Sequence, residues 1–334
     1  MFGEIRGREA IIASWARLFV SKKVDVNLAT ILVDGDRVAV LGAITSPDLH
    51  EWFGRPAVDM PISYRIVLLF TLADGKVVHD RRLYDSAGVV ERLEKARVDK
   101  ELRTAADVQR ALLSRTPRAG AFYTAVGDSI PCRAIGGDFY EFIDLPSGDL
   151  GILIGDVAGK GPAAALLAAM LQGMFAADPE GRSPSAVLER INRRLLARDL
   201  GAKYATLVYA VLLANGRLIY CNAGHNPPLL LTARGPERLT IGGPILGGFA
   251  DATFTDGCLQ LDAGDTLVMF TDGVTEARNA AGDEFGEDGL LGRVAAGRGL
   301  EPAAVVERVL AGVRDFCATT EQYDDVTVAV TRFG

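Results

Sequence analysis

The fold is decided by the stretch LGILIGDVAGKG at residues 150–161 and by the sequence PAAALLAAMLQGMFAA that follows it at 162–177. An apolar run that ends on Asp156 predicts a buried strand with a carboxylate at its end. Gly159 and Gly161 allow a sharp turn, and Pro162 suits the first turn of a helix. The Gly-Lys-Gly turn is not a nucleotide-binding loop, because it lacks the GxxxxGK[ST] spacing. The stretch therefore predicts strand, turn and helix, with an acid at the junction.

Strands and helices mix on both sides of this unit, without strict βαβ order, from Arg118 to Gly334. We expect strands at 139–142, 150–156, 204–213, 217–222, 228–231, 266–271 and 325–331. We expect helices at 162–177, 184–197, 287–296 and 302–317. Hairpins among long helices, with Asn215-Gly216 as one turn signal, predict an α+β sandwich of largely antiparallel sheets with helices outside.

The first part of the chain has a different pattern, and we place it in residues 1–92. An amphipathic helix through Ile11 to Phe19 precedes strand-like segments at 27–33, 37–45, 62–72 and 76–84. Asp34-Gly35 and Asp74-Gly75 are turn signals between them. We predict a smaller α+β domain with a curved sheet.

A charged, helical pattern from Val89 to Leu113 joins the two parts, and we set a connector helix at 93–117 before a domain at 118–334. Such a helix is either a packed connector or a short coiled coil at a dimer interface. The sequence leaves both readings open.

Composition excludes several classes. The 334 residues are 49% hydrophobic and 24% charged, which is typical of a globular protein. The net charge of −7, without a basic run, argues against nucleic-acid binding. The four cysteines are widely spaced, which argues against a zinc site. The chain shows no apolar span for a membrane and no secretion signal, so we place it in the cytoplasm.

Four acids flank apolar strand segments, where a carboxylate can turn inward: Asp138, Asp156, Asp272 and Asp324. A buried carboxylate is costly unless it is paired or bound to a cation, and few basic residues flank these positions. Oxygen ligands select hard ions such as magnesium or manganese. Two such ions sharing a carboxylate and a hydroxide suit phosphoester hydrolysis. The sequence therefore predicts a site for two divalent cations.

The same segments resemble the SpoIIE-type bacterial branch of the metal-dependent, protein phosphatase 2C-like serine/threonine phosphatases. The motifs, in order over the chain, are 108–113 (VQRALL), 136–140 (GGDFY), 155–161 (GDVAGKG), 222–228 (NAGHNPP), 243–247 (GPILG), 270–277 (FTDGVTEA) and 324–327 (DDVT). The resemblance implies an α-β-β-α sandwich. It also implies that Asp156 bridges both metals, that Asp138 and the Val157 carbonyl complete one site, and that Asp272 and Asp324 hold the other. Asp325 is the less favoured ligand of its pair.

In this family a metal-bridging hydroxide attacks a phosphoserine or phosphothreonine directly. The resemblance implies a phosphorylated regulatory protein as substrate, typically a STAS-type anti-sigma-factor antagonist. Ala158 stands where eukaryotic relatives have a histidine, so the acid for the leaving group is unidentified. Arg133 is either a phosphate contact or a solvated surface residue. For His225 we favour a structural role over an acid.

Residues 1–92 resemble SnoaL-like members of the nuclear transport factor 2-like superfamily, through 7–11 (GREAI), Phe53-Gly54, 74–78 (DGKVV) and 84–89 (YDSAGV). The resemblance implies a cone-like α+β fold, here truncated by one or two helices, so we expect no enclosed enzymatic pocket. In this branch the first domain usually regulates, which implies a sensing or dimerising role and a homodimer.

Three readings remain: a working phosphatase, a pseudophosphatase that signals through its first domain, and a first domain that binds small molecules as the main functional unit. No expected metal ligand is missing, and therefore the working phosphatase leads.

Overall fold

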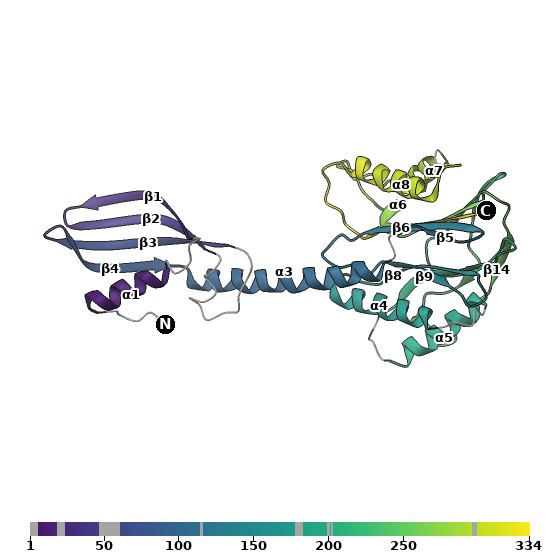
Figure 1. Cartoon of the computed structure of the whole chain (residues 1–334), viewed down its shortest axis with the longest axis horizontal. Helices are drawn as coiled ribbons and strands as arrows, with labels where there is room; N and C mark the ends of the chain where they lie inside the picture. Colours follow the sequence, from purple (N-terminus) through teal and green to yellow (C-terminus); the bar gives the residue numbers. More distant parts are fainter. Residues whose placement is uncertain are drawn as a thin grey trace. The chain divides into compact units, whose positions relative to one another are not determined.

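The computed structural model describes residues 6–18, 24–46, 61–113, 116–177, 183–198, 201, 203–295 and 299–334. The chain divides into two compact units, Met1–Arg103 and Thr104–Gly334 (Figure 1). One helix, α3 (Ser86–Leu112), contributes residues to both. Its bounds correspond to the helical pattern that the sequence shows from Val89 to Leu113.

The first unit contains α1 (Arg8–Leu18) and an antiparallel sheet in the order β1-β2-β3-β4. The strands are β1 (Asp25–Asp34), β2 (Arg37–Ser46), β3 (Ile62–Ala73) and β4 (Lys76–Tyr84). Asp74 and Gly75 both have positive φ, 51° and 71°, as the tight hairpin turn between β3 and β4 requires. One helix followed by a meander of strands is what the sequence predicted. The Phe53-Gly54 segment lies outside the described residues.

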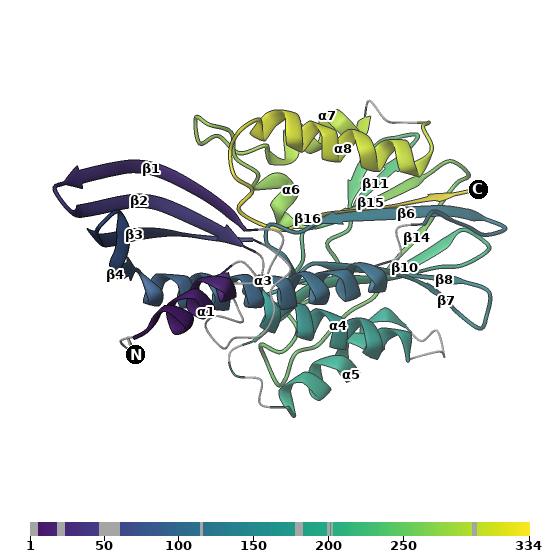
Figure 2. The same ribbon diagram turned by 60° about the vertical axis from the view of Figure 1, so that its left-hand side comes forward.

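The second unit is an α-β-β-α sandwich, as predicted (Figure 2). One sheet has the strand order β13-β10-β9-β8-β7, with β14 also pairing with β10, and the other has the order β12-β11-β15-β16-β6-β5. In the first sheet the strands are β7 (Phe139–Asp144), β8 (Leu150–Val157), β9 (Ala205–Leu212), β10 (Arg217–Ala223), β13 (Gly242–Gly243) and β14 (Gly257–Gln260). In the second they are β5 (Arg118–Ala119), β6 (Tyr123–Ile130), β11 (Leu229–Thr232), β12 (Gly235–Arg238), β15 (Thr266–Phe270) and β16 (Val326–Phe333).

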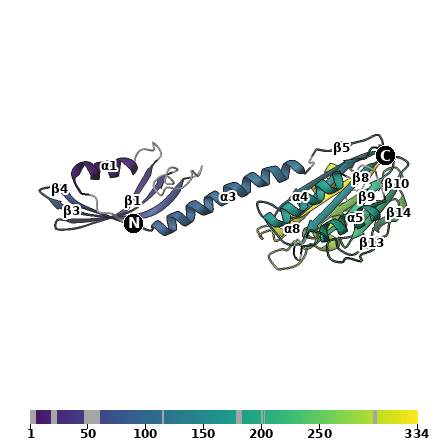
Figure 3. The ribbon, with the colours of Figure 1, turned by 90° about the horizontal axis from the view of Figure 1, so that it is seen from below.

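Helices cover the outer face of each sheet. Contacts join α4 (Pro162–Ala176) to β7 and β8, and α5 (Pro184–Leu196) to β9 and β10; Figure 3 shows both helices over that sheet. The other sheet is covered by α8 (Pro302–Cys317), which packs on β6 and β16 and against α7 (Gly286–Ala295). A one-turn helix, α6 (Asp272–Thr275), follows β15 directly.

Alternate residues of a strand join different hydrophobic cores, because successive side chains of a strand point to opposite faces of the sheet. In β15, Leu267 and Met269 join the core between the sheets, whereas Val268 and Phe270 join the core under α7 and α8. Each sheet therefore packs on both faces, and the acids at the strand ends are left at the edge of the sandwich. Within the described ranges, no helix combines the length and the apolar character that a membrane span requires.

Candidate metal centre

The predicted acids lie at strand ends in both sheets. Asp138 precedes β7, and Asp156 is the second-last residue of β8, the partner of β7. Asp272 opens α6 after β15, and Asp324 comes just before β16, the partner of β15. Because one pair of neighbouring strands comes from each sheet, the four carboxylates meet across the sandwich edge. As a consequence of this proximity, the charges of Asp272 and Asp324 both raise the pKa of Asp156.

Asp138 is the most deeply buried of the four acids, with 4% of its surface exposed. Its Oδ2 accepts a hydrogen bond of 2.7 Å from the Thr271 hydroxyl. Burial, and then the charge of Asp156, raise its pKa well above the ordinary value, although hydrogen bonds from Thr271 and Thr327 act in the opposite sense. The site thus holds a carboxyl group whose negative charge nothing else in the described chain fully offsets.

Asp156 also has a raised pKa, because burial and neighbouring carboxylates disfavour its charged form. Burial, followed by the charges of Asp272, Asp324 and Asp325, raises its pKa to about 7, and a hydrogen bond with Asp138 lowers it. Burial and Asp324 also raise the pKa of Asp272, which is lowered by the Gly273 N–H and by Lys160. Like charges held together in a protein call for a cation. The donor set of carboxylate oxygens fits a hard divalent ion.

The Val157 carbonyl lies against the loop that carries Asp138. A Cβ atom on Gly137 would stand 2.8 Å from the Val157 oxygen and 3.3 Å from Asp156 Oδ1. Only glycine permits this approach, and the Val157 N–H also donates to the Gly137 carbonyl at 3.3 Å. The carbonyl and the two carboxylates could therefore serve one ion together.

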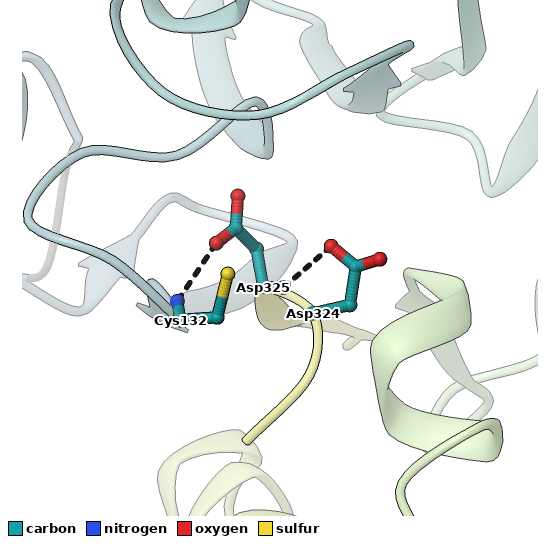
Figure 4. A group of neighbouring side chains, drawn as sticks. All are labelled: Cys132, Asp324 and Asp325. Atoms are coloured by element: carbon teal, nitrogen blue, oxygen red, sulfur yellow. Dashed lines mark hydrogen bonds between the residues drawn. The ribbon is translucent and has the colours of Figure 1, made fainter. Parts of the chain in front are cut away.

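Asp324 and Asp325 have different surroundings (Figure 4). Asp324 Oδ2 forms an ion pair of 2.9 Å with Lys160 Nζ, and its Oδ1 accepts the Asp325 N–H at 2.9 Å. Asp325 Oδ1 accepts the Cys132 N–H at 2.8 Å, and Oδ2 accepts the Gly137 N–H at 2.7 Å. Both oxygens of Asp325 are thus occupied by backbone donors of the loop, whereas Asp324 accepts one backbone N–H and pairs through Oδ2 with a displaceable lysine.

Among the described residues, the one group of three metal-ligand types with donor atoms within 4.8 Å of one another is Cys132, Asp324 and Asp325. Burial and the Asp325 charge raise the pKa of the Cys132 thiol to about 11. A protonated thiol is a poor ligand, because the thiolate is the form that binds metals. This group therefore adds the Asp324 carboxylate to the site, and not a sulfur.

Of the other residues that the sequence singled out, Arg133 lies in the loop beside the acids and His225 lies in the protein interior. Arg133 is exposed, in the loop before Asp138, and makes no hydrogen bond or ion pair with the part of the chain that is described. His225 is buried; its Nδ1 lies 2.8 Å from the Thr206 hydroxyl, and burial lowers its pKa to about 4. A neutral, buried ring supports the structural role. Gly159 and Gly161 have positive φ, 102° and 79°, as the predicted turn into α4 requires.

Sequence reasoning assigned no contact to Gln109, Lys160 or Thr271, and it named Asp325 only as the less favoured ligand of its pair. Thr271 stands directly before Asp272, and Lys160 lies in the turn that follows Asp156, so their positions were a usable signal. Gln109 lies in the motif at 108–113, but nothing in the sequence of that helix indicates a contact with Gly136.

Both parts of the chain match known protein families. The family model of Stage II sporulation protein E (SpoIIE) matches residues 146–334, and that of the SnoaL-like domain matches residues 1–80. The chain is 32% identical over 235 residues to Protein IcfG of Synechocystis sp., covering 60% of this chain and 37% of the relative. It is 32% identical over 191 residues to Phosphoserine phosphatase RsbU of Bacillus subtilis, covering 55% and 56%.

The chain thus spans 37% and 56% of the length of these two curated relatives. Among solved structures, the SiaA-PP2C domain of Pseudomonas aeruginosa matches with a TM-score of 0.63 at 18% identity, covering 72% of this chain and 99% of that one. That likeness shows the fold, a protein phosphatase 2C-like sandwich. With more than half of its length matched by the family model, the chain belongs to the SpoIIE family and carries a SnoaL-like domain at its N-terminus.

Proposed function

We propose that this chain is a metal-dependent protein serine/threonine phosphatase. The observation that carries the proposal is the set of four carboxylates, Asp138, Asp156, Asp272 and Asp324, which lie near one another with one lysine, Lys160, paired to Asp324. Raised pKa values at Asp138, Asp156 and Asp272 support it. Membership of the SpoIIE family and the likeness to a phosphoserine phosphatase support the same activity.

In this proposal Asp138, Asp156 and the Val157 carbonyl would hold one divalent cation, manganese or magnesium, and Asp272 and Asp324, again with Asp156, would hold a second. When bound, such ions would supply a deprotonated water at neutral pH. Lys160, which pairs with Asp324 at 2.9 Å, would give up that pair to an ion and leave its positive charge beside the site. Arg133, exposed in the loop before Asp138, is the candidate to orient the phosphate.

The substrate we propose is a phosphoserine or phosphothreonine on a regulatory protein, of the STAS-type anti-sigma-factor antagonist class. An exposed site at the edge of the sandwich supports a protein substrate, because Asp324 and Lys160 remain 43% and 37% exposed. A folded partner can reach such a site without a channel.

For the N-terminal unit we propose a sensing and dimerising role. Every residue of β1 is exposed, and β1 pairs only with β2 among the described strands. An exposed strand edge with Ile31 and Leu32 at 57% and 58% exposure favours pairing with another chain. A depression of about 490 Å³, lined by Leu32, Leu69 and Arg81 among others, could bind a small-molecule signal.

The activity is tested by phosphate release from a phosphoserine peptide, with and without Mn²⁺, for wild type and Asp272→Asn. We expect Mn²⁺-dependent turnover that falls at least 100-fold in the variant, with Asp315→Asn, an exposed acid of α8, as the matched control. Equal turnover in Asp272→Asn and wild type would refute the assignment. Absence of turnover in all proteins with any metal would favour the pseudophosphatase.

A further inference from the structure

The loop between β6 and β7, residues 131–138, carries Asp138 but forms no helix or strand of its own. Its conformation therefore depends on side chains that bind its backbone. Two of them do so from elsewhere in the chain, Gln109 and Asp325, and Gln322 binds the carbonyl of Ile130, directly before the loop. The accuracy with which Asp138 is placed depends on these bonds.

Asp325 and Gln322 hold the loop from the side of β16. Asp325, 5% exposed, accepts the N–H groups of Cys132 and Gly137, which lie on either side of the loop. Gln322 Nε2 donates to the Ile130 carbonyl at 2.8 Å, at the end of β6, and to the Asp324 carbonyl at 2.6 Å. The start of the loop and its end are thus tied to the segment before β16.

Gln109, in the last turn of α3, holds the loop from the other side. Its Nε2 donates to the Gly136 carbonyl at 2.8 Å, and its Oε1 accepts the Gly136 N–H at 3.1 Å. One planar amide thus pairs with both polar groups of one residue, as a neighbouring strand would. The cavity between α3 and the loop is only about 10 Å³, the lower limit for one water.

Gly136 is enclosed between these two partners. A Cβ atom there would lie 2.2 Å from Asp325 Oδ2, so the residue cannot move toward Asp325, and Gln109 prevents it from moving away. Gly137 then touches the Val157 carbonyl, and Asp138 follows. A shift of Gly136 therefore displaces Asp138 relative to the Val157 carbonyl and Asp156 on β8.

We propose that Gln109 is a positioning residue of the metal centre: its side-chain amide fixes Gly136, and through it Asp138, in the geometry that binds a divalent ion. This inference rests on the proposed function. Gln109 touches no proposed ligand itself, so it acts only through the backbone of the loop. A helix outside the sandwich thereby contributes to metal affinity.

The test compares Gln109→Met, which keeps length and apolar volume but loses both bonds, with Gln109→Glu, which keeps the acceptor for the Gly136 N–H. Gln260→Met is the matched control, because Gln260 Nε2 also donates to a backbone carbonyl, that of Asn215, at 2.8 Å in a different hairpin. Mn²⁺ affinity is measured by electron paramagnetic resonance, and exchange of the amide hydrogens of 136–138 by mass spectrometry without metal.

We expect Gln109→Met to bind Mn²⁺ about tenfold more weakly, as two lost hydrogen bonds imply, and to exchange the loop amides about tenfold faster. Gln109→Glu should fall between it and wild type, and Gln260→Met should match wild type. Wild-type affinity and wild-type exchange in Gln109→Met would overturn the inference while leaving the phosphatase intact. Wild-type protein that binds no Mn²⁺ would overturn the proposed function, and the exchange measurement would then decide the role of Gln109 in holding the loop.

Discussion

Replacing Asp272 with asparagine should stabilise the metal-free protein while it removes one of the proposed metal ligands. In the absence of metal, Asp272 is a half-buried acid beside Asp324, and its charge raises the pKa of Asp156. Asparagine has nearly the same shape, and its side-chain oxygen can still accept the Gly273 N–H. The substitution therefore removes a repulsion and preserves the packing.

The size of the effect follows from the pKa of Asp156, which rises from 3.8 to about 7. That difference corresponds to about 4 kcal/mol between the two protonation states. A carboxyl group with a raised pKa in the folded state lowers stability as pH rises through about 7, because the folded state must then give up a proton that it holds tightly. Burial is the largest cause and Asp272 the second, so we assign about 1–2 kcal/mol to Asp272 at pH 8.

The assay is thermal unfolding in EDTA at pH 8 and pH 5, following the transition that Mn²⁺ shifts in the wild type. A gain of about 1–2 kcal/mol should raise Tm at pH 8 by about 2–8 °C for a unit of this size. The gain should shrink at pH 5, where Asp156 is protonated in both proteins. Mn²⁺ should raise Tm of the wild type only. Asp315→Asn should change neither value.

If Asp272→Asn melted at or below the wild-type temperature in EDTA at pH 8, the reasoning from like charges would be refuted. The carboxylates would then be stabilised by their surroundings in the empty site.

Three further predictions concern the surroundings of the site. Gly137→Ala should weaken Mn²⁺ binding and lower the free energy of unfolding by about 1–3 kcal/mol, because its Cβ would lie 2.8 Å from the Val157 carbonyl. Titration calorimetry measures the Mn²⁺ affinity, and urea unfolding measures the stability. Unchanged affinity would contradict the close approach. Burial lowers the pKa of His225 to about 4, so its neutral form stabilises the fold fully above about pH 6.5. That stability is lost as the pH drops toward 4, by up to about 3 kcal/mol. Urea unfolding at pH 7.5 and 4.5 should show the loss in the wild type but not in His225→Gln. Leu171→Ala in the fully buried face of α4 should cost about 2–5 kcal/mol, whereas Leu166→Ala, at 73% exposure on the same helix, should stay within about 0.5 kcal/mol of wild type.

The long elements of the sandwich could mostly be predicted from periodicity and turn signals, but the short strands β5, β12, β13 and β14, the one-turn helix α6 and the eight-residue strand β6 were not predicted. The reason is clearest for β6. Its sequence, YTAVGDSI, contains Gly127, Asp128 and Ser129, which are uncommon inside strands. The structure gives two of them a use. The Tyr140 ring packs over Gly127, where a Cβ would lie 2.5 Å from it, and the Ser129 hydroxyl accepts a hydrogen bond from Thr327. Both contacts are made with residues distant in sequence, so the local pattern of residues 123–130 does not predict them.

The candidate site divides in the same way. Asp138, Asp156, Asp272 and Asp324 stand beside glycine or at strand ends, and this local signal was enough to select them. The different hydrogen-bond partners of Asp324 and Asp325 could not be predicted from the residues next to them in the sequence. It arises because the loop of 131–138 presents N–H groups to Asp325 and leaves Asp324 to Lys160. Tertiary contact, and not residue type, assigns the two roles.

The position of β16 has a consequence for synthesis of the protein. This strand, the last in the sequence, lies between β15 and β6 inside its sheet, and the bond from Gly137 to Asp325 spans 188 residues. On a ribosome that adds about 5–20 residues per second, roughly 10–40 s pass between the appearance of one partner and the other. During that interval the nascent chain holds Asp138 and Asp156 but has neither the loop clamp of Asp325 nor Asp324. The set of acids that we propose for the metal centre is therefore assembled only after the segment with Asp324 and Asp325 has been synthesised, and a shorter nascent chain would lack part of it.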